Sequence, residues 1–224
     1  MVAPELYLFA NVNLVPRKYD DWQSAYDHLA EYVWDKEPTT KTYYFGIPFD
    51  VAEDVSGATL MFAFEIYENR ERLTETHLKS AAMAKFLERA LPIMTTGLDL
   101  AYYTKVGGFL DSRGDRQECG IMHDTKIECV SPAARETVIS ELQAIARGLE
   151  ADEGVYTYVI CASMEEKTGL RVFARFQSKD DLERVSRTGN VLRFWKEFGQ
   201  TKIATMQQRG YFPNKKGWLH RSKL

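Results

Sequence analysis

The sequence predicts an α+β protein in which two ferredoxin-like repeats pack sheet to sheet into one barrel. The order strand, helix, strand, strand, helix, strand occurs in residues 5–106 and again in residues 119–208. Individual residues also match between the two copies, as Leu73 does with Leu182 and Phe86 with Trp195. Each repeat has helices for only one face of its sheet. A second copy of the sheet is therefore the expected cover for the other face.

The first repeat begins with an apolar, β-favouring segment that ends before Pro16. Apolar residues then recur at helical spacing from Trp22 to Val33, and Glu37-Pro38 ends this helix. Asn69 is placed to cap a second helix. The expected strands of this repeat cover residues 5–14, 41–47, 59–67 and 98–106.

The second repeat follows the same plan. Ser131-Pro132 provides an N-cap and a first-turn proline for its first helix, and Ser178 opens a capping box for the next. Its expected strands cover residues 119–130, 155–162, 170–176 and 201–208. A polar link over residues 110–117 divides the chain into a first repeat (1–112), a second repeat (113–212) and a flexible basic tail (213–224).

Composition excludes several classes of protein. The 29 basic and 32 acidic residues give a net charge of −3, which argues against a protein that coats nucleic acid. No apolar run is long enough for a membrane span, and no secretory signal is visible. The three cysteines, Cys119, Cys129 and Cys161, are not clustered in the sequence. We therefore expect them to be reduced residues of the core and not ligands of a metal. Dinucleotide, phosphate-loop and metal-binding motifs are absent, so no cofactor is expected.

Polar residues that suggest chemistry gather in the first repeat. Alternation along the strand 59–67 places Glu65 and Tyr67 on one face of the sheet. His77 comes four residues after Leu73 and so leans toward the packed side of its helix. A histidine beside a carboxylate and a phenol has the properties of a general base near neutral pH.

These residues resemble a known family. The run from Phe64 to Asn69, then Leu73, the stretch His77-Leu78-Lys79-Ser80 and Phe86 are similar to the antibiotic biosynthesis monooxygenase (ABM) group of dimeric α/β-barrel proteins. The turns that carry glycine in that group lack it here, at Pro16-Arg17 and at residues 37–39. Members usually build the barrel from two chains. The resemblance therefore implies an intramolecular barrel, and it leaves open whether such chains pair further as homodimers.

The resemblance also implies an activity, the cofactor-independent oxidation by O₂ of a small hydrophobic phenol, quinol or polyketide of secondary metabolism. In this hypothesis His77 takes a proton from the substrate and Glu65 orients the imidazole. Tyr67 and either Asn11 or Asn13 then stabilise the oxyanion. The sequence does not choose between the two asparagines.

Other interpretations stay open at this stage. His77, Tyr67 and Glu65 are also explained as structural residues, which predicts a non-catalytic protein that binds a small ligand. Haem-degrading relatives place a histidine at the His77 position, but they usually have tryptophan where this chain has Tyr67. The second repeat has Ala174, Phe176 and Ser186 at the three matching places, so the site is expected in the first repeat alone. His28 and His123 have no recognisable partner and are interpreted as structural.

The chain ends in Ser222-Lys223-Leu224, which is the tripeptide read by the peroxisomal import receptor. The sequence therefore predicts a peroxisomal protein, and a cytoplasmic one if the tripeptide is not read. A peroxisome is an oxidative compartment, which suits an enzyme that uses O₂.

Overall fold

The structure is a computed structural model that describes residues 4–111 and 118–221. The chain divides into two compact units. Unit 1 combines Met1–Tyr102 with Pro213–Leu224, and unit 2 comprises Tyr103–Phe212. Each unit has its own sheet and its own helices, and they are described in turn.

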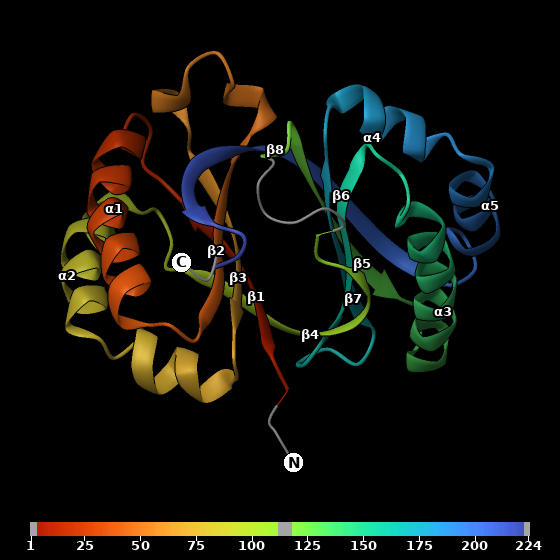
Figure 1. Ribbon diagram of the computed structural model, residues 1–224, viewed down its shortest axis with the longest axis horizontal. Coiled ribbons are helices and arrows are strands. Elements are labelled where there is room, and N and C mark those ends of the chain that lie inside the picture. Colours follow the sequence, from red (N-terminus) through yellow and green to blue (C-terminus); the bar gives the residue numbers. More distant parts are fainter. Residues whose placement is uncertain (1–3, 112–117, 222–224) are drawn as a thin grey trace. The chain divides into compact units, whose positions relative to one another are not determined.

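Unit 1 contains a sheet covered on one face by helices α1 and α2 (Figure 1). Strand β3 lies between β1 and β2, and both pairs are antiparallel. The elements of this unit are β1 (Leu6–Asn13), α1 (Tyr19–Lys36), β2 (Thr40–Pro48), β3 (Leu60–Tyr67), the π-helix η3 (Arg72–His77) and α2 (Ala81–Ala90). Short 3₁₀ turns occur at Phe49–Val51, Val55–Gly57 and Leu91–Ile93.

Local sequence explains the limits of these helices. The predicted apolar face of α1 is buried, including Trp22, Tyr26 and Leu29. The helix ends at Lys36 because Pro38 disfavours helical geometry for the residue before it. Ser80 caps α2 by accepting a hydrogen bond from the Met83 backbone N–H, at 3.0 Å.

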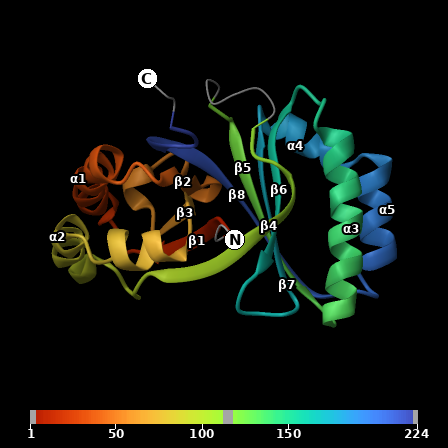
Figure 2. The same cartoon turned by 60° about the horizontal axis from the view of Figure 1, so that its bottom comes forward.

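Unit 2 repeats the arrangement with β7 between β5 and β6, again antiparallel. Its elements are β5 (Ile121–Cys129), α3 (Pro132–Leu149), β6 (Val155–Ser163), β7 (Gly169–Phe176), α4 (Lys179–Ser186) and α5 (Gly189–Phe198). Helices α3 and α5 lie along one face of the sheet (Figure 2). Its apolar core is formed by the helix-facing residues of β7, such as Leu170 and Val172, and by α3 residues such as Leu142.

Two strands belong to both units, β4 (Asp99–Phe109) and β8 (Ile203–Trp218). The order of hydrogen-bonded neighbours is β1-β3-β2-β8-β5-β7-β6-β4, and it closes on itself as in an eight-stranded barrel. The predicted α+β class and the barrel of two ferredoxin-like repeats are therefore confirmed.

The structure corrects the prediction at two places. The second helix of each repeat is divided, into η3 and α2 in unit 1 and into α4 and α5 in unit 2. The flexible tail expected from residue 213 is instead strand as far as Trp218. Gly217, at a φ of 76°, lies so close to the Tyr43 carbonyl that no side chain would fit there. Thr42 Oγ1 donates to the Leu219 carbonyl at 2.5 Å.

Parts of the predicted link and tail fall outside the described residues, namely residues 112–117 and Ser222-Lys223-Leu224. Within the described ranges, no helix is both long and apolar enough to cross a membrane.

Candidate functional site

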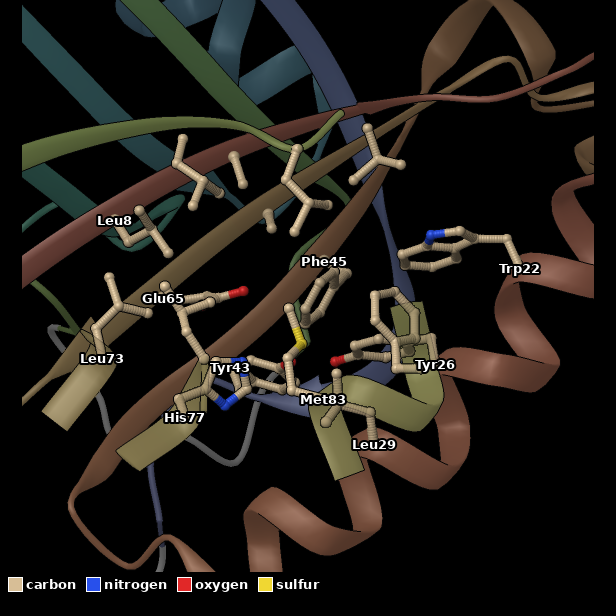
Figure 3. A pocket seen from close by; sticks show the side chains of 17 residues that line it. Leu8, Trp22, Tyr26, Leu29, Tyr43, Phe45, Glu65, Leu73, His77 and Met83 are labelled. Carbon is tan, nitrogen blue, oxygen red and sulfur yellow. The ribbon is translucent and has the colours of Figure 1, made fainter. Parts of the chain in front are cut away.

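Unit 1 encloses a cavity between the helix-covered face of its sheet and the helices α1, η3 and α2 (Figure 3). The free volume is about 40 Å³. Its wall is mostly apolar, with Leu8, Phe45 and Met83 among the lining residues. Polar side chains also line it, those of Tyr26, Tyr43, Glu65, His77 and Trp22.

The register of the sheet explains how Glu65 comes to face the cavity. Leu8 of β1 and Tyr43 of β2 lie directly opposite Glu65 on its two sides. Residues opposite one another share a face of the sheet, so all three point toward the helices. The predicted placement of Glu65 on this face is what the structure has.

His77 is held by a partner that the sequence did not reveal. Its Nδ1 lies 3.0 Å from Oε2 of Glu37, and the two residues are only 3% and 2% exposed. Thr40 Oγ1 also donates to this Oε2, at 3.4 Å. Since a carboxylate oxygen accepts hydrogen bonds, Nδ1 carries the hydrogen and Nε2 is the ring nitrogen left for a ligand.

Glu65 has a different partner from the one predicted. The Tyr67 hydroxyl donates to Glu65 Oε2 at 2.6 Å. Burial raises the pKa of Glu65, although a charge on His77 and the hydrogen bond from Tyr67 oppose this. Burial and the neighbouring Glu65 raise the pKa of Tyr67 well above its ordinary value, so Tyr67 remains a donor. The expectation that Glu65 orients the imidazole is therefore corrected, because Glu37 does so.

Asn11 and Asn13 are not brought to the cavity. The neighbouring β1 residues Leu8, Ala10 and Val12 line it, so the asparagines point to the opposite face. Asn13 Nδ2 donates to Thr96 Oγ1 at 3.1 Å, and Asn11 Nδ2 to Asp99 at 3.5 Å. The parity of the strand thus directs both asparagines away from the cavity that Glu65 and His77 line.

His77 ends a single π-helical stretch. The Leu78 backbone N–H donates to the Leu73 carbonyl at 2.9 Å, a bond across five residues. From the cap at Asn69 to the cap at Ser80, the segment is one residue longer than the matching segment of unit 2, from Ser178 to Thr188. Such insertions form π-bulges and occur often at functional sites.

Unit 2 has a cavity at the equivalent place, with a volume of about 60 Å³. Ala174, Phe176 and Ser186 line it, as the alignment with Glu65, Tyr67 and His77 predicts. His123 also lines this cavity, and burial lowers the pKa of its imidazole. Its Nδ1 lies 3.5 Å from Thr125 Oγ1.

The residues of the first cavity do not fit a haem. A free volume of about 40 Å³ approaches that of one or two waters and is far below that of a macrocycle. The bond between His77 Nδ1 and Glu37 leaves Nε2 free for a metal, so the volume is what argues against haem. Among the described residues, no three His, Cys, Asp or Glu side chains come together as metal ligands.

Comparison with known proteins gives a likeness of fold. No family model and no curated protein matches the chain. A candidate monooxygenase from Fusobacterium nucleatum matches over 100% of both chains, with a TM-score of 0.80 and 15% identity. The chain has the fold of that protein. A candidate monooxygenase from Lactobacillus acidophilus matches over 94% of both chains, with a TM-score of 0.71 and 10% identity.

An anthrone oxidase-like protein is similar as well. It matches over 93% of this chain and 91% of its own, with a TM-score of 0.62 and 11% identity. The fold implied by the resemblance to the ABM group is thus supported along nearly the whole chain. Identities this low show the fold alone, and the chemistry depends on the residues of the cavity.

Proposed function

We propose that unit 1 contains the site of a cofactor-independent monooxygenase of the ABM type, which oxidises a small hydrophobic phenol, quinol or polyketide with O₂. The observation that carries this proposal is the buried pair of His77 and Glu37 at an apolar cavity, together with the pair of Glu65 and Tyr67. Buried titratable groups that converge on a pocket are typical of sites that move protons.

The first step is removal of a proton from the substrate. His77 accepts the proton at Nε2, and Glu37 at Nδ1 stabilises the resulting imidazolium. Glu65 lines the same cavity, and burial raises its pKa, which favours the protonated form that can donate to a developing oxygen anion. Exclusion of water by the apolar wall strengthens both interactions.

The electrons come from the substrate itself. In an anthrone, the methylene carbon loses its two hydrogens and gains one oxygen atom as a carbonyl. The second oxygen atom leaves as water, so the four electrons that reduce O₂ all come from that carbon. The same balance holds when a phenol becomes a para-quinone. No external reductant is required, and O₂ is the co-substrate.

Entry of such a substrate requires the cavity to widen. A benzene-sized ligand needs about 150 Å³, several times the free volume present. Leu29 and Phe86 line both the cavity and an outer groove between α1 and α2. We infer that the substrate enters from this groove as these two side chains and the flexible Met83 move aside.

The test is O₂ uptake by the purified protein with anthrone, compared with His77→Gln. Glutamine keeps a hydrogen-bond donor toward Glu37 but cannot act as the base, so uptake is expected to fall by about 100-fold or more. His123→Gln in unit 2 is the matched control and leaves uptake unchanged. Uptake by His77→Gln at the wild-type rate rules out this site as the base.

A non-catalytic binding protein is the second candidate, because a mostly apolar cavity also suits the binding of a small ligand without chemistry. In that case anthrone or a quinol raises the melting temperature without consuming O₂. Haem degradation is a third candidate, and the volume of the cavity argues against it. A Soret shift on adding haemin that disappears in His77→Gln is the result that would restore it.

We further propose that the chain is delivered to peroxisomes through its C-terminal tripeptide. The described chain just before it is anchored, because the Arg221 guanidinium donates to the carbonyls of Thr40, Trp34 and Val33. A fluorescent fusion that keeps this terminus free should be punctate and become diffuse when Leu224 is deleted. A diffuse signal from the intact fusion refutes it.

Homodimers of the chain are a separate proposal, tested by the mass in solution.

A further inference from the structure

The hydroxyl of Tyr26 is a buried polar group without a partner among the described residues. Tyr26 lies inside α1 and is only 1% exposed. Figure 3 shows its hydroxyl directed into the cavity, toward Met83 and Tyr43. Nearly all buried polar groups in folded proteins have hydrogen-bond partners, so an exception at a cavity points to a partner held in the cavity, either a ligand or a water that a ligand displaces.

The Tyr26 ring cannot turn its hydroxyl toward water. Trp22 stacks on it with the ring centroids 5.1 Å apart and an interplanar angle of 5°. Tyr43 stacks at 5.6 Å, and Phe45 lies 4.3 Å away. The hydroxyl therefore has a fixed direction. The indole Nε1 of Trp22, which is also 1% exposed and lines the cavity, has no partner in the described part of the chain either.

Tyr26 is a donor under all physiological conditions. Burial raises the pKa of its hydroxyl well above the ordinary value, and the nearby Tyr43 and Glu65 raise it further. A protonated phenol can always donate, although its oxygen can also accept, and an indole N–H is a donor only. The α1 side of the cavity thus offers hydrogens, whereas Nε2 of His77 on the η3 side accepts one. A ligand that satisfies both sides has an acceptor at one end and an acidic hydroxyl at the other.

We propose that Tyr26 is a specificity-determining residue whose hydroxyl binds a carbonyl oxygen of the substrate. The substrate class is an aromatic hydroxyketone, with its carbonyl toward α1 and its hydroxyl toward His77. This inference rests on the proposed function for the hydroxyl end only. The carbonyl end depends on the unpaired hydroxyl of Tyr26.

The test compares two ligands of the same shape, 4-hydroxyacetophenone and 4-ethylphenol, by calorimetric titration under nitrogen. Only the first has a carbonyl. Tyr26→Phe keeps the stacked ring and removes the hydroxyl, so it should weaken binding of the ketone about 10-fold. Binding of 4-ethylphenol should change less than about twofold. The matched control is Tyr158→Phe, which removes a buried hydroxyl from the cavity of unit 2 and should leave both affinities unchanged.

The free protein gives a second readout. If the Tyr26 hydroxyl has no protein partner until a ligand binds, Tyr26→Phe removes an unsatisfied group. The melting temperature of the free protein should then stay the same or rise. A fall in melting temperature means that the hydroxyl has a structural partner and overturns the proposal. Equal weakening of both ligands overturns it too, as does the absence of binding of the ketone to the wild-type protein.

These results are separable from a failure of the oxidation itself. The titrations contain no O₂, so a preference for the ketone that depends on Tyr26 stands even if no oxygen is ever consumed. Conversely, if O₂ uptake depends on His77 but not on Tyr26, the proposed oxidation is supported and the assignment of a hydroxyketone substrate is wrong.

Discussion

The two units have the same fold and a cavity at the same place, but they use their polar residues differently. In unit 1, carboxyl groups reach the helix-covered side of the sheet, where Glu37 meets His77 and Glu65 meets Tyr67. In unit 2, a buried ion pair joins Arg171 to Asp124 through two hydrogen bonds of 2.7 Å. Arg171 alternates along β7 with the cavity-lining Val172, so this pair lies on the opposite face of the sheet.

The positions around Glu65 show the difference residue by residue. Glu65 lies between Leu8 and Tyr43 across the strands, whereas its counterpart Ala174 lies between His123 and Tyr158. The aromatic neighbour is thus kept, the carboxyl group is lost, and a histidine replaces a leucine. The fold supplies a cavity in both units, and the paired acid distinguishes the first.

The largest effect is expected at His77. Loss of a general base costs about 10²- to 10⁴-fold in rate, so His77→Gln should fall to the background rate with anthrone. His123→Gln should keep the wild-type rate, because its cavity has no paired acid. Initial O₂ uptake by both variants, measured side by side, checks this. Equal losses would mean that the two cavities work together.

The extra residue of η3 comes next. Deleting the exposed Lys79 gives this segment the length of its counterpart in unit 2, so the π turn should rewind to an α turn as in α4. His77 would then shift against Glu37, and a shift near 1 Å costs about 100-fold in rate. The measurement is kcat together with the melting temperature, and Lys79→Ala is the control. A folded deletion variant with normal kcat contradicts the role given to the bulge.

Glu37 has a smaller expected effect, because it acts through His77. Glu37→Gln still bonds to the ring but no longer stabilises its positive charge, so kcat with anthrone should fall about 10-fold or more. KM should change little, since the cavity wall keeps its shape. Steady-state O₂ uptake gives the two constants separately. A rise in KM at constant kcat would instead assign Glu37 to binding.

Parity and periodicity explain what the sequence predicts correctly. Alternation in β3 placed Glu65 on the cavity face, and the helical spacing from Leu73 placed His77 beside it. The same alternation in β1 turns Asn11 and Asn13 away, although alternation alone does not show which face of a strand is the inner one. Tyr26 appeared only as an apolar helix position, because periodicity reports burial and says nothing about a missing partner.

Long-range pairing explains what the sequence does not predict. Glu37 was interpreted as part of a helix-ending signal, and its partner His77 lies 40 residues further along the chain. Nothing in local propensity shows that an acid at a helix end is buried. The strand pairing of residues 213–218 was missed for a similar reason, since the basic residues of that segment predict exposure.

The stability of Glu65→Gln should depend on pH in a definite direction. The pKa of Glu65 is raised in the folded protein, so ionising it there costs more than in the unfolded chain. This cost is absent below the ordinary value of 4.5 and grows as pH rises toward the folded pKa. The variant should therefore gain melting temperature relative to wild type from pH 4 to pH 8, by a few degrees. If the difference in melting temperature between the variant and wild type is constant across this range, Glu65 is not a buried carboxyl group with a raised pKa.

The smallest effect is expected at His123, whose counterpart in unit 1 is Leu8. Burial lowers the pKa of His123, so the folded protein favours its neutral form. The stability that this contributes is present above the ordinary value of 6.5 and is lost as pH falls through the lowered folded pKa. His123→Leu removes this loss, so between pH 7.5 and pH 5 the variant should lose less stability than wild type, by about 1 kcal/mol or less. Urea unfolding at the two pH values measures the difference. If the two proteins lose stability equally, His123 is already accessible to protons, and the cavity of unit 2 is open to water where that of unit 1 is closed.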